Sequence, residues 1–138
     1  MQVEHSISIA APPAQIFRIY AAVDQWHTWD PDTEAASLSG PFAVGTRGRL
    51  TPSKGRPVPM VLTEVVPERS FTVESSIPLL RLRFEHELVA GRAATAVTHR
   101  VLVSGLLSYL IGPGLVRQLD RDLPKTLANL KRLAEGED

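Results

Sequence analysis

The sequence predicts an α+β domain in which a curved antiparallel sheet of about seven strands wraps around one long C-terminal helix. Two observations predict this fold. Apolar and polar residues alternate in several segments, which indicates half-buried strands, and leucines recur at helical spacing near the C-terminus. Two short helices are expected after the first strand, and all the other strands before the long helix. Because each element has one apolar face, we expect a single packed domain over residues 1–138.

The composition is that of an ordinary globular protein without excess charge. The chain is 43% hydrophobic, and its 15 basic residues balance its 15 acidic residues. Because a chain without net charge attracts polyanions weakly, we expect no nucleic-acid partner. The absence of cysteine excludes disulfides and thiolate metal sites and suits a cytoplasmic location. We expect neither a signal peptide nor a membrane span, because the longest apolar run is short and is interrupted by Gly-Pro-Gly.

The beginning of the chain predicts a strand followed by two short helices. Between residues 3 and 9 every second residue faces one side, and that set is Val3, His5, Ile7 and Ile9. The prolines of "APPAQIFRIYAAV" suit the first turn of a helix, where a missing N–H costs no hydrogen bond. A second short helix carries Trp26 and Trp29, whose spacing of three places both rings on one side.

Six further strands are expected before the long helix. Two short strands near 35–38 and 46–51 are separated by glycines and prolines that favour turns. Two antiparallel strands follow in "MVLTEVV" and "FTVESSI", and we assign Val61 and Val73 to their inner sides. Two longer strands, 80–89 and 94–104, show the clearest alternation in the chain, which fixes their register strongly.

The C-terminal segment predicts an amphipathic helix of about twenty residues. Its apolar stripe steps by four, four, four and three residues, through Leu115, Leu119, Leu123, Leu127 and Leu130. Pro124 lies inside this stripe, so we expect a kink there. The preceding "GLLSYLIGPG" is expected to form a separate short helix that either belongs to the core or covers a cavity, with Tyr109 as its polar group. Together with loop 52–59, it is the candidate gate.

Two histidines occupy positions of the predicted sheet that should be apolar. The inner residues around them are Leu82, Phe84, Leu88, Val97, Val101 and Val103. A turn that pairs Leu88 with Thr95 would place His86 opposite Val97 and His99 opposite Phe84. A buried imidazole needs hydrogen-bond partners. Each ring therefore either bonds a nearby carbonyl or hydroxyl group, or contacts water or a polar ligand in a cavity.

Five segments of the sequence resemble, in order, the START-like superfamily of the polyketide cyclase/dehydrase type, which has the helix-grip fold. They are "IAAPPAQIFRIYAAVDQWHTWDP", "GPFAVGTRG", "VLTEVVPERSFTVES", "ATAVTHRVLVSG" and "DLPKTLANLKRLAE". The resemblance implies a cup in which the sheet grips the last helix and leaves a cavity for lipids, sterols or aromatic polyketides. Some members of the superfamily cyclise or dehydrate polyketides, and others only bind or carry their ligands.

The resemblance turns the inner residues into a candidate ligand site. The residues assigned to it are His5, Trp29, Val61, Val73, Phe84, His86, Val97, His99, Tyr109 and Leu119. The first hypothesis is a protein that binds a small hydrophobic or aromatic molecule. The alternative is a polyketide cyclase, aromatase or dehydratase in which His86 or His99 transfers a proton. A third reading, an interaction module that binds another protein, rests on family analogy alone.

Other features of the sequence leave alternatives open or argue against a class of site. Trp29 either packs against the edge of the sheet or lines the mouth of the cavity. Three inward histidines invite a zinc site, but no His-x-His or Glu-x-x-His pair places two ligands together, so we expect no metal. No phosphate-binding or dinucleotide-binding glycine motif is present, and no cofactor is expected. We expect a monomer or a weak homodimer.

Overall fold

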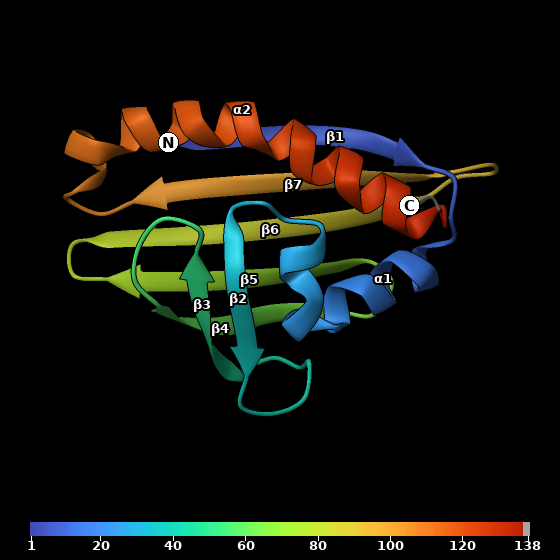
Figure 1. The fold of residues 1–138 in the computed structure, drawn as a ribbon, viewed down its shortest axis with the longest axis horizontal. Helices are drawn as coiled ribbons and strands as arrows, with labels where there is room; N and C mark the ends of the chain where they lie inside the picture. Colours follow the sequence, from blue (N-terminus) through green and yellow to red (C-terminus); the bar gives the residue numbers. More distant parts are fainter. Residues whose placement is uncertain (137–138) are drawn as a thin grey trace.

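The computed structural model describes residues 1–136 and shows a seven-stranded antiparallel sheet curled around one long helix (Figure 1). The strands are β1 (Gln2–Ile9), β2 (Thr33–Leu38), β3 (Arg47–Pro52), β4 (Val58–Val66), β5 (Ser70–Ile77), β6 (Leu80–Ala90) and β7 (Thr95–Ser104). The helices are α1 (Pro13–Ala21), the short 3-10 helix η1 (Val23–Thr28) and α2 (Ser108–Ala134). The predicted helix-grip fold is confirmed. Residues 137 and 138 of the predicted domain lie outside the described residues.

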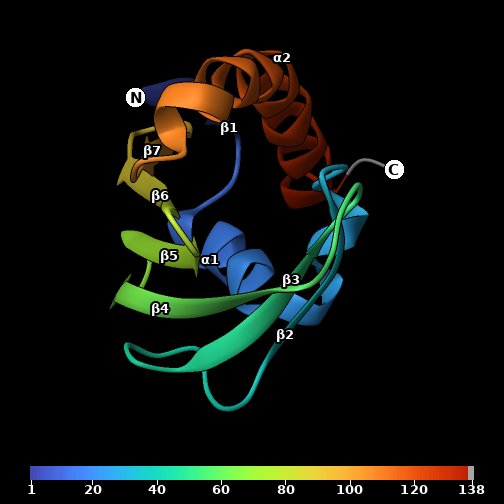
Figure 2. The ribbon, with the colours of Figure 1, turned by 90° about the vertical axis from the view of Figure 1, so that its left-hand side faces the viewer.

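The two edges of the sheet are strands that lie close together in the sequence. The spatial order is β1-β7-β6-β5-β4-β3-β2, and α1 and η1 connect one edge to the other. Figure 2 shows how the sheet curls, so that β2 and β3 turn away from β1 and β7 and α2 lies across the open side. A sheet of this shape buries its concave face against the helix and leaves its convex face in solvent.

The last helix is longer than the sequence predicts. Ser108–Ala134 forms one helix of 27 residues that continues through Pro113 and Pro124, whereas we expected a separate short helix before the leucine stripe. Proline keeps a helical φ and removes only one hydrogen bond, so a long helix that packs along β1 and β7 can include it. Figure 1 shows a bend in its axis, as expected for a helix with an internal proline. Within residues 1–136, no helix is long and apolar enough to cross a membrane.

The register of β4 differs from strict alternation. A bulge between Leu62 and Glu64 shifts the phase within the strand, so that Met60 and Leu62 are buried and Val65 packs beside the core. Val61 pairs with Glu74, and paired residues of neighbouring strands share one face, so Val61 lies on the outer face with Glu74. The prediction that Val61 faces inward is therefore wrong, because the bulge moves the inner positions of the strand by one residue.

Candidate functional site

A cavity of about 340 Å³ lies between the concave face of the sheet and α2. Most of its wall is apolar or aromatic, from Trp29, Val73, Leu82, Phe84, Val101, Leu115 and Leu119. The exposed residues Ser53, Lys54 and Gln118 also line it, which places its opening between the β3–β4 loop and α2. The cavity has the shape and the lining of a small-molecule site.

The two unexpected histidines face each other across β6 and β7. His86 pairs with His99, and their ring centroids lie 4.6 Å apart. The predicted register was wrong by two residues. The ladder continues to the pair of Ala90 and Thr95, and the turn closes with a 2.9 Å hydrogen bond from the Gly91 N–H to the Ala94 carbonyl. The tighter turn places both imidazoles at the same height on the inner face.

A buried tyrosine holds one of these rings. Tyr20 of α1 is fully buried, and its hydroxyl lies 2.8 Å from Nε2 of His99. Burial raises the pKa of Tyr20 far above its ordinary value, so the phenol keeps its proton. The buried hydroxyl proton needs an acceptor, and among the described residues its hydrogen-bond partner is His99 Nε2. The phenol therefore donates to Nε2, and neutral His99 carries its own proton on Nδ1.

The second ring is oriented by the backbone of β5. Nδ1 of His86 lies 3.2 Å from the carbonyl oxygen of Phe71, which can only accept, so Nδ1 is protonated and Nε2 keeps a free lone pair. The imidazole also stacks on the Phe71 ring, with a centroid distance of 3.9 Å. His86 retains accessible surface because it borders the cavity.

Both imidazoles are neutral near pH 7. Burial lowers the pKa of His86 to about 4, against the opposing effect of its hydrogen bond to the Phe71 carbonyl. Burial also lowers the pKa of His99 well below its ordinary value, and the neighbouring His86 lowers it further. The wall of the cavity therefore presents imidazole donors and acceptors without a formal charge.

The two tryptophans of η1 differ in their hydrogen bonding. Nε1 of Trp26 donates to the Tyr20 carbonyl at 2.8 Å, whereas Nε1 of Trp29 is buried and has no partner among the described residues. Trp29 packs against Tyr20 of α1, with a centroid distance of 6.0 Å, and also lines the cavity, as the second alternative for this ring expected. A buried donor without a partner is costly unless water or a ligand accepts its hydrogen bond.

Two carboxylates lie at the rim of the cavity. Asp30 accepts hydrogen bonds from the Asp32 N–H and the Thr33 hydroxyl, at 3.0 and 2.9 Å. Burial raises the pKa of Asp30, and burial together with Asp122 and Asp30 raises the pKa of Asp32 to about 6. Both aspartates line the cavity, so an anionic ligand would meet carboxylates at its edge.

The structure brings most of the predicted site residues together at this cavity. Those that line it are Trp29, Val73, Phe84, His86, His99 and Leu119. Val97 is completely buried in the core beside them. Sequence reasoning missed Tyr20. A tyrosine within the apolar stripe of α1 was the available signal, because a buried hydroxyl group needs a polar partner in the core.

Two other predicted site residues lie elsewhere. His5 faces α2, where its Nε2 lies 2.8 Å from an Asp120 carboxylate oxygen outside the cavity. Tyr109 in the first turn of α2 is 81% exposed and does not line the cavity. No residue of 105–114 lines the cavity, so of the two alternatives for this segment, cover of the cavity is not seen. Loop 52–59 supplies Pro52, Ser53, Lys54 and Val58 to the lining, and its role as a gate stays a prediction.

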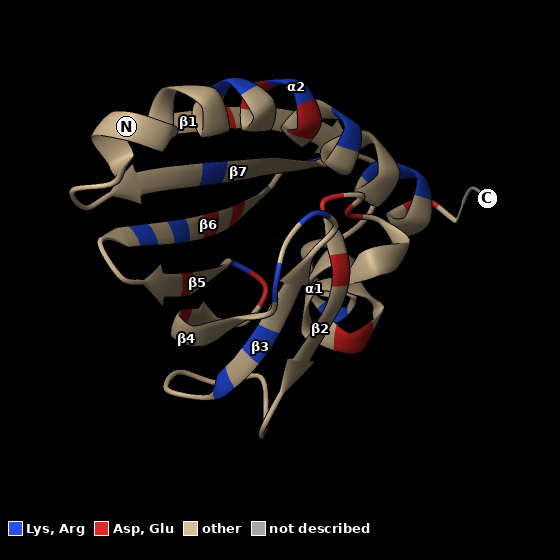
Figure 3. Cartoon of the chain, turned by 60° about the vertical axis from the view of Figure 1, so that its left-hand side comes forward, with Lys and Arg blue, Asp and Glu red and all other residues tan. Residues whose placement is uncertain are grey.

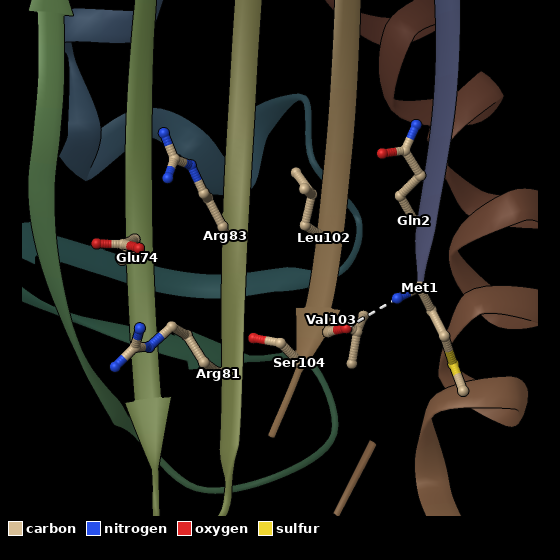
Figure 4. Close-up of a pocket in the computed structure, with 8 residues that line it drawn as sticks. All are labelled: Met1, Gln2, Glu74, Arg81, Arg83, Leu102, Val103 and Ser104. Atoms are coloured by element: carbon tan, nitrogen blue, oxygen red, sulfur yellow. Dashed lines mark hydrogen bonds between the residues drawn. The ribbon is translucent and has the colours of Figure 1, made fainter. Parts of the chain in front are cut away.

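A larger depression, of about 430 Å³, lies on the outer face of the sheet (Figure 4). Figure 4 shows Arg81 and Arg83 projecting from β6 over β5, on the side of Glu74. Their outward direction agrees with the alternation of β6. The depression is wide open and contains neither an imidazole nor an aromatic ring, so the inner cavity is the better candidate site.

Comparisons with known proteins agree with this architecture. A START superfamily protein from Mycobacterium smegmatis has a TM-score of 0.79 at 14% identity, over 98% of this chain and 97% of that one. The di-domain ARO/CYC StfQ from the steffimycin biosynthetic pathway has a TM-score of 0.77 at 15% identity, over 98% of this chain and 50% of that one. A STAR-related lipid transfer protein from Xanthomonas axonopodis has a TM-score of 0.71 at 16% identity, over 96% and 85% of the two chains.

Sequence comparison is specific at the level of the family. A search of curated proteins found no match. The family model described as "Polyketide cyclase / dehydrase and lipid transport" matches residues 1–135. The match covers every element of the fold, from β1 to the end of α2. This chain therefore belongs to the polyketide cyclase/dehydrase and lipid transport family.

Proposed function

We propose that this protein binds a small, neutral, hydrophobic or aromatic molecule with a few oxygen atoms in the cavity between the sheet and α2. The observation that carries the proposal is the pair of neutral imidazoles in an otherwise apolar wall, at a ring distance of 4.6 Å. The family supports ligand binding as a class of function. A cytoplasmic location, a single domain and a monomer or weak homodimer stay predictions.

The unmatched polar atoms of the lining favour a ligand that both donates and accepts hydrogen bonds. Among the described residues, Nε2 of His86 has a free lone pair, and Nδ1 of His99 carries a proton that has no hydrogen-bond acceptor. A hydroxyl group next to a carbonyl group, as in many phenols and aromatic ketones, matches this set. The volume of about 340 Å³ favours a compact molecule over a long lipid.

The alternative is a polyketide cyclase, aromatase or dehydratase, and the free lone pair of His86 favours it. That nitrogen is a candidate proton acceptor beside the cavity. A general base works best when its pKa lies near the working pH, and a pKa of about 4 makes His86 a weak base at pH 7. Binding without a reaction is therefore the better-supported function.

Thermal unfolding with a panel of pure compounds tests the proposal. We expect neutral hydroxylated aromatic ketones such as emodin and naringenin to raise the Tm by several degrees, because a ligand at one hundred times its Kd adds about 2.7 kcal/mol of stability. Tryptophan fluorescence should be quenched, since Trp29 lines the cavity. The matched pair 2-naphthol and 2-naphthoate tests the charge preference, and the neutral compound should bind more tightly. A panel that produces neither a Tm shift nor quenching would contradict the proposal.

A further inference from the structure

Exposed large apolar side chains are concentrated at one end of the molecule. Six of the eleven exposed large hydrophobic residues in the described part of the chain gather there, and we call them the apolar end: Ile77, Leu79, Leu106, Tyr109, Leu110 and Ile111. Leu106, Tyr109 and Leu110 are 71%, 81% and 77% exposed. The two segments that form this end, 75–80 and 104–116, contain no charged residue, and Figure 3 shows the start of α2 without charge. Such a concentration indicates an interaction surface.

The apolar end is one built surface because its two segments touch. The Leu107 N–H donates to the Leu79 carbonyl at 2.9 Å, which joins the β5–β6 turn to the segment before α2. Gly105 makes the approach possible. Its φ is +100°, and a Cβ at this position would lie 2.5 Å from the Leu79 carbonyl oxygen. The exposed side chains are therefore held by the fold.

The conformation of Leu79 points to selection for its side chain. Leu79 has a φ of 69°, in the left-handed region where glycine is favoured and branched side chains are strained. Its side chain is 58% exposed, so burial in the core does not compensate for this strain. Strained residues of this kind are enriched at functional sites. A binding partner for the side chain would account for leucine at this position.

We propose that the apolar end docks on the surface of an anionic lipid membrane. The net charge of the chain is zero, but the charges nearest the apolar end in the sequence are mostly positive: Arg81 and Arg117, against Glu74. Figure 4 shows Arg81 projecting from β6 on the outer face, beside the end of β5. Apolar side chains with Tyr109 among them and cations at the border match the acyl and headgroup layers of such a membrane.

A second copy of the chain fits this surface less well. A symmetric dimer would place the same patch on both subunits, and would bring the bordering cations of one copy toward those of the other. Lipid headgroups carry the opposite charge. The position also suits the proposed cavity, since Leu82 and Leu115 line it a few residues beyond Leu79 and Ile111. Docking would therefore bring one wall of the cavity near the lipid.

Sedimentation of the full chain with vesicles tests the proposal. We expect binding to phosphatidylcholine vesicles that contain about one third phosphatidylglycerol, and weaker binding to phosphatidylcholine alone. Leu106→Ser/Leu110→Ser should weaken binding about tenfold or more, because two apolar anchors are lost. The matched control Val44→Ser/Val89→Ser changes two exposed valines outside the apolar end and should bind as the wild type does. Arg81→Gln should weaken binding to the anionic vesicles about fivefold.

Three results would overturn the docking proposal. The first is that the wild type binds neither kind of vesicle, and the second is that the valine control loses as much binding as the leucine variant. The third is that the wild type forms a dimer in analytical ultracentrifugation, that Leu106→Ser/Leu110→Ser dissociates it, and that the wild type does not bind vesicles. The last result would assign the surface to a second copy. Because the substituted leucines lie outside the cavity, the Tm shift with emodin or naringenin should persist in this variant. The ligand proposal and the docking proposal can therefore fail separately.

Discussion

Acidification from about pH 6.5 to pH 4 is expected to lower the free energy of unfolding by about 3 kcal/mol through His86 alone. The imidazole of the unfolded chain takes up a proton near its ordinary pKa of 6.5, whereas burial holds the folded pKa at about 4. Between these values the unfolded state binds more protons than the folded state. The contribution of neutral His86 to the free energy of unfolding is therefore fully present above about pH 6.5 and is lost as the pH falls toward 4. His99, whose pKa is also lowered, changes stability in the same direction.

Urea unfolding at several pH values measures this effect. His86→Asn keeps a side-chain N–H that can donate to the Phe71 carbonyl but does not titrate, so its stability should fall less between pH 6.5 and 4 than that of the wild type. The exposed His27 offers the matched control His27→Asn, which should keep the wild-type pH dependence. Identical pH dependence in His86→Asn and the wild type would contradict the buried neutral imidazole.

Asp32 acts in the opposite direction and should be separated in the same experiment. Its folded pKa is raised to about 6, so the folded state binds more protons than the unfolded state between about pH 4 and pH 6. Its effect on stability is therefore unfavourable above pH 6 and is relieved as the pH falls. The same measurements on Asp32→Asn should show a steeper loss of stability on acidification, because the opposing group is gone.

Filling the cavity from α2 should remove ligand binding while the fold is retained. Leu119 is half-buried and lines the cavity, so the larger ring of Leu119→Trp can extend into its open volume of about 340 Å³. We expect the affinity for the panel compound with the largest Tm shift to fall at least about tenfold, since the ring and the ligand would need the same space. The Tm without ligand should stay the same or rise, because the added ring buries apolar area.

Isothermal titration calorimetry of the purified variant measures this loss. Leu133→Trp places the same ring on the same helix at a residue that is 44% exposed and outside the cavity lining, and it should bind the compound as the wild type does. An unchanged Kd in Leu119→Trp would mean that the compound binds elsewhere.

The fold could be predicted from the sequence because local patterns determine most of its elements. The alternation in β6 and β7 and the leucine stripe of α2 each predict an apolar face, and two such faces have few ways to pack together. The errors came from a bulge and a turn, which the alternation of apolar and polar residues does not encode. The bulge in β4 moved the inner positions by one residue, and the turn after β6 was tighter than assumed, which moved His86 from Val97 to His99.

The candidate site could be predicted only in part. His86 and His99 stood out because they break an apolar alternation. The partner of His99 did not stand out, because Tyr20 lies 79 positions away and reads as one more member of a helical stripe. Tyr109 was assigned to the cavity because an apolar segment is usually buried, and the structure exposes it instead. Long-range contacts and exposed apolar side chains depend on the assembled fold, which no local pattern specifies.

Histidine ring nitrogen resonances, recorded by NMR at pH 7 with and without emodin or naringenin, test the central claim most directly. The structure predicts two neutral rings that are both protonated on Nδ1, with Nε2 of His99 in a hydrogen bond to Tyr20. A bound compound should shift the resonances of His86 Nε2 and of the His99 Nδ1–H, since neither group has a hydrogen-bond partner among residues 1–136. A positively charged ring at pH 7, or saturable binding that leaves the resonances of both rings unchanged, would contradict a ligand site built on these two imidazoles.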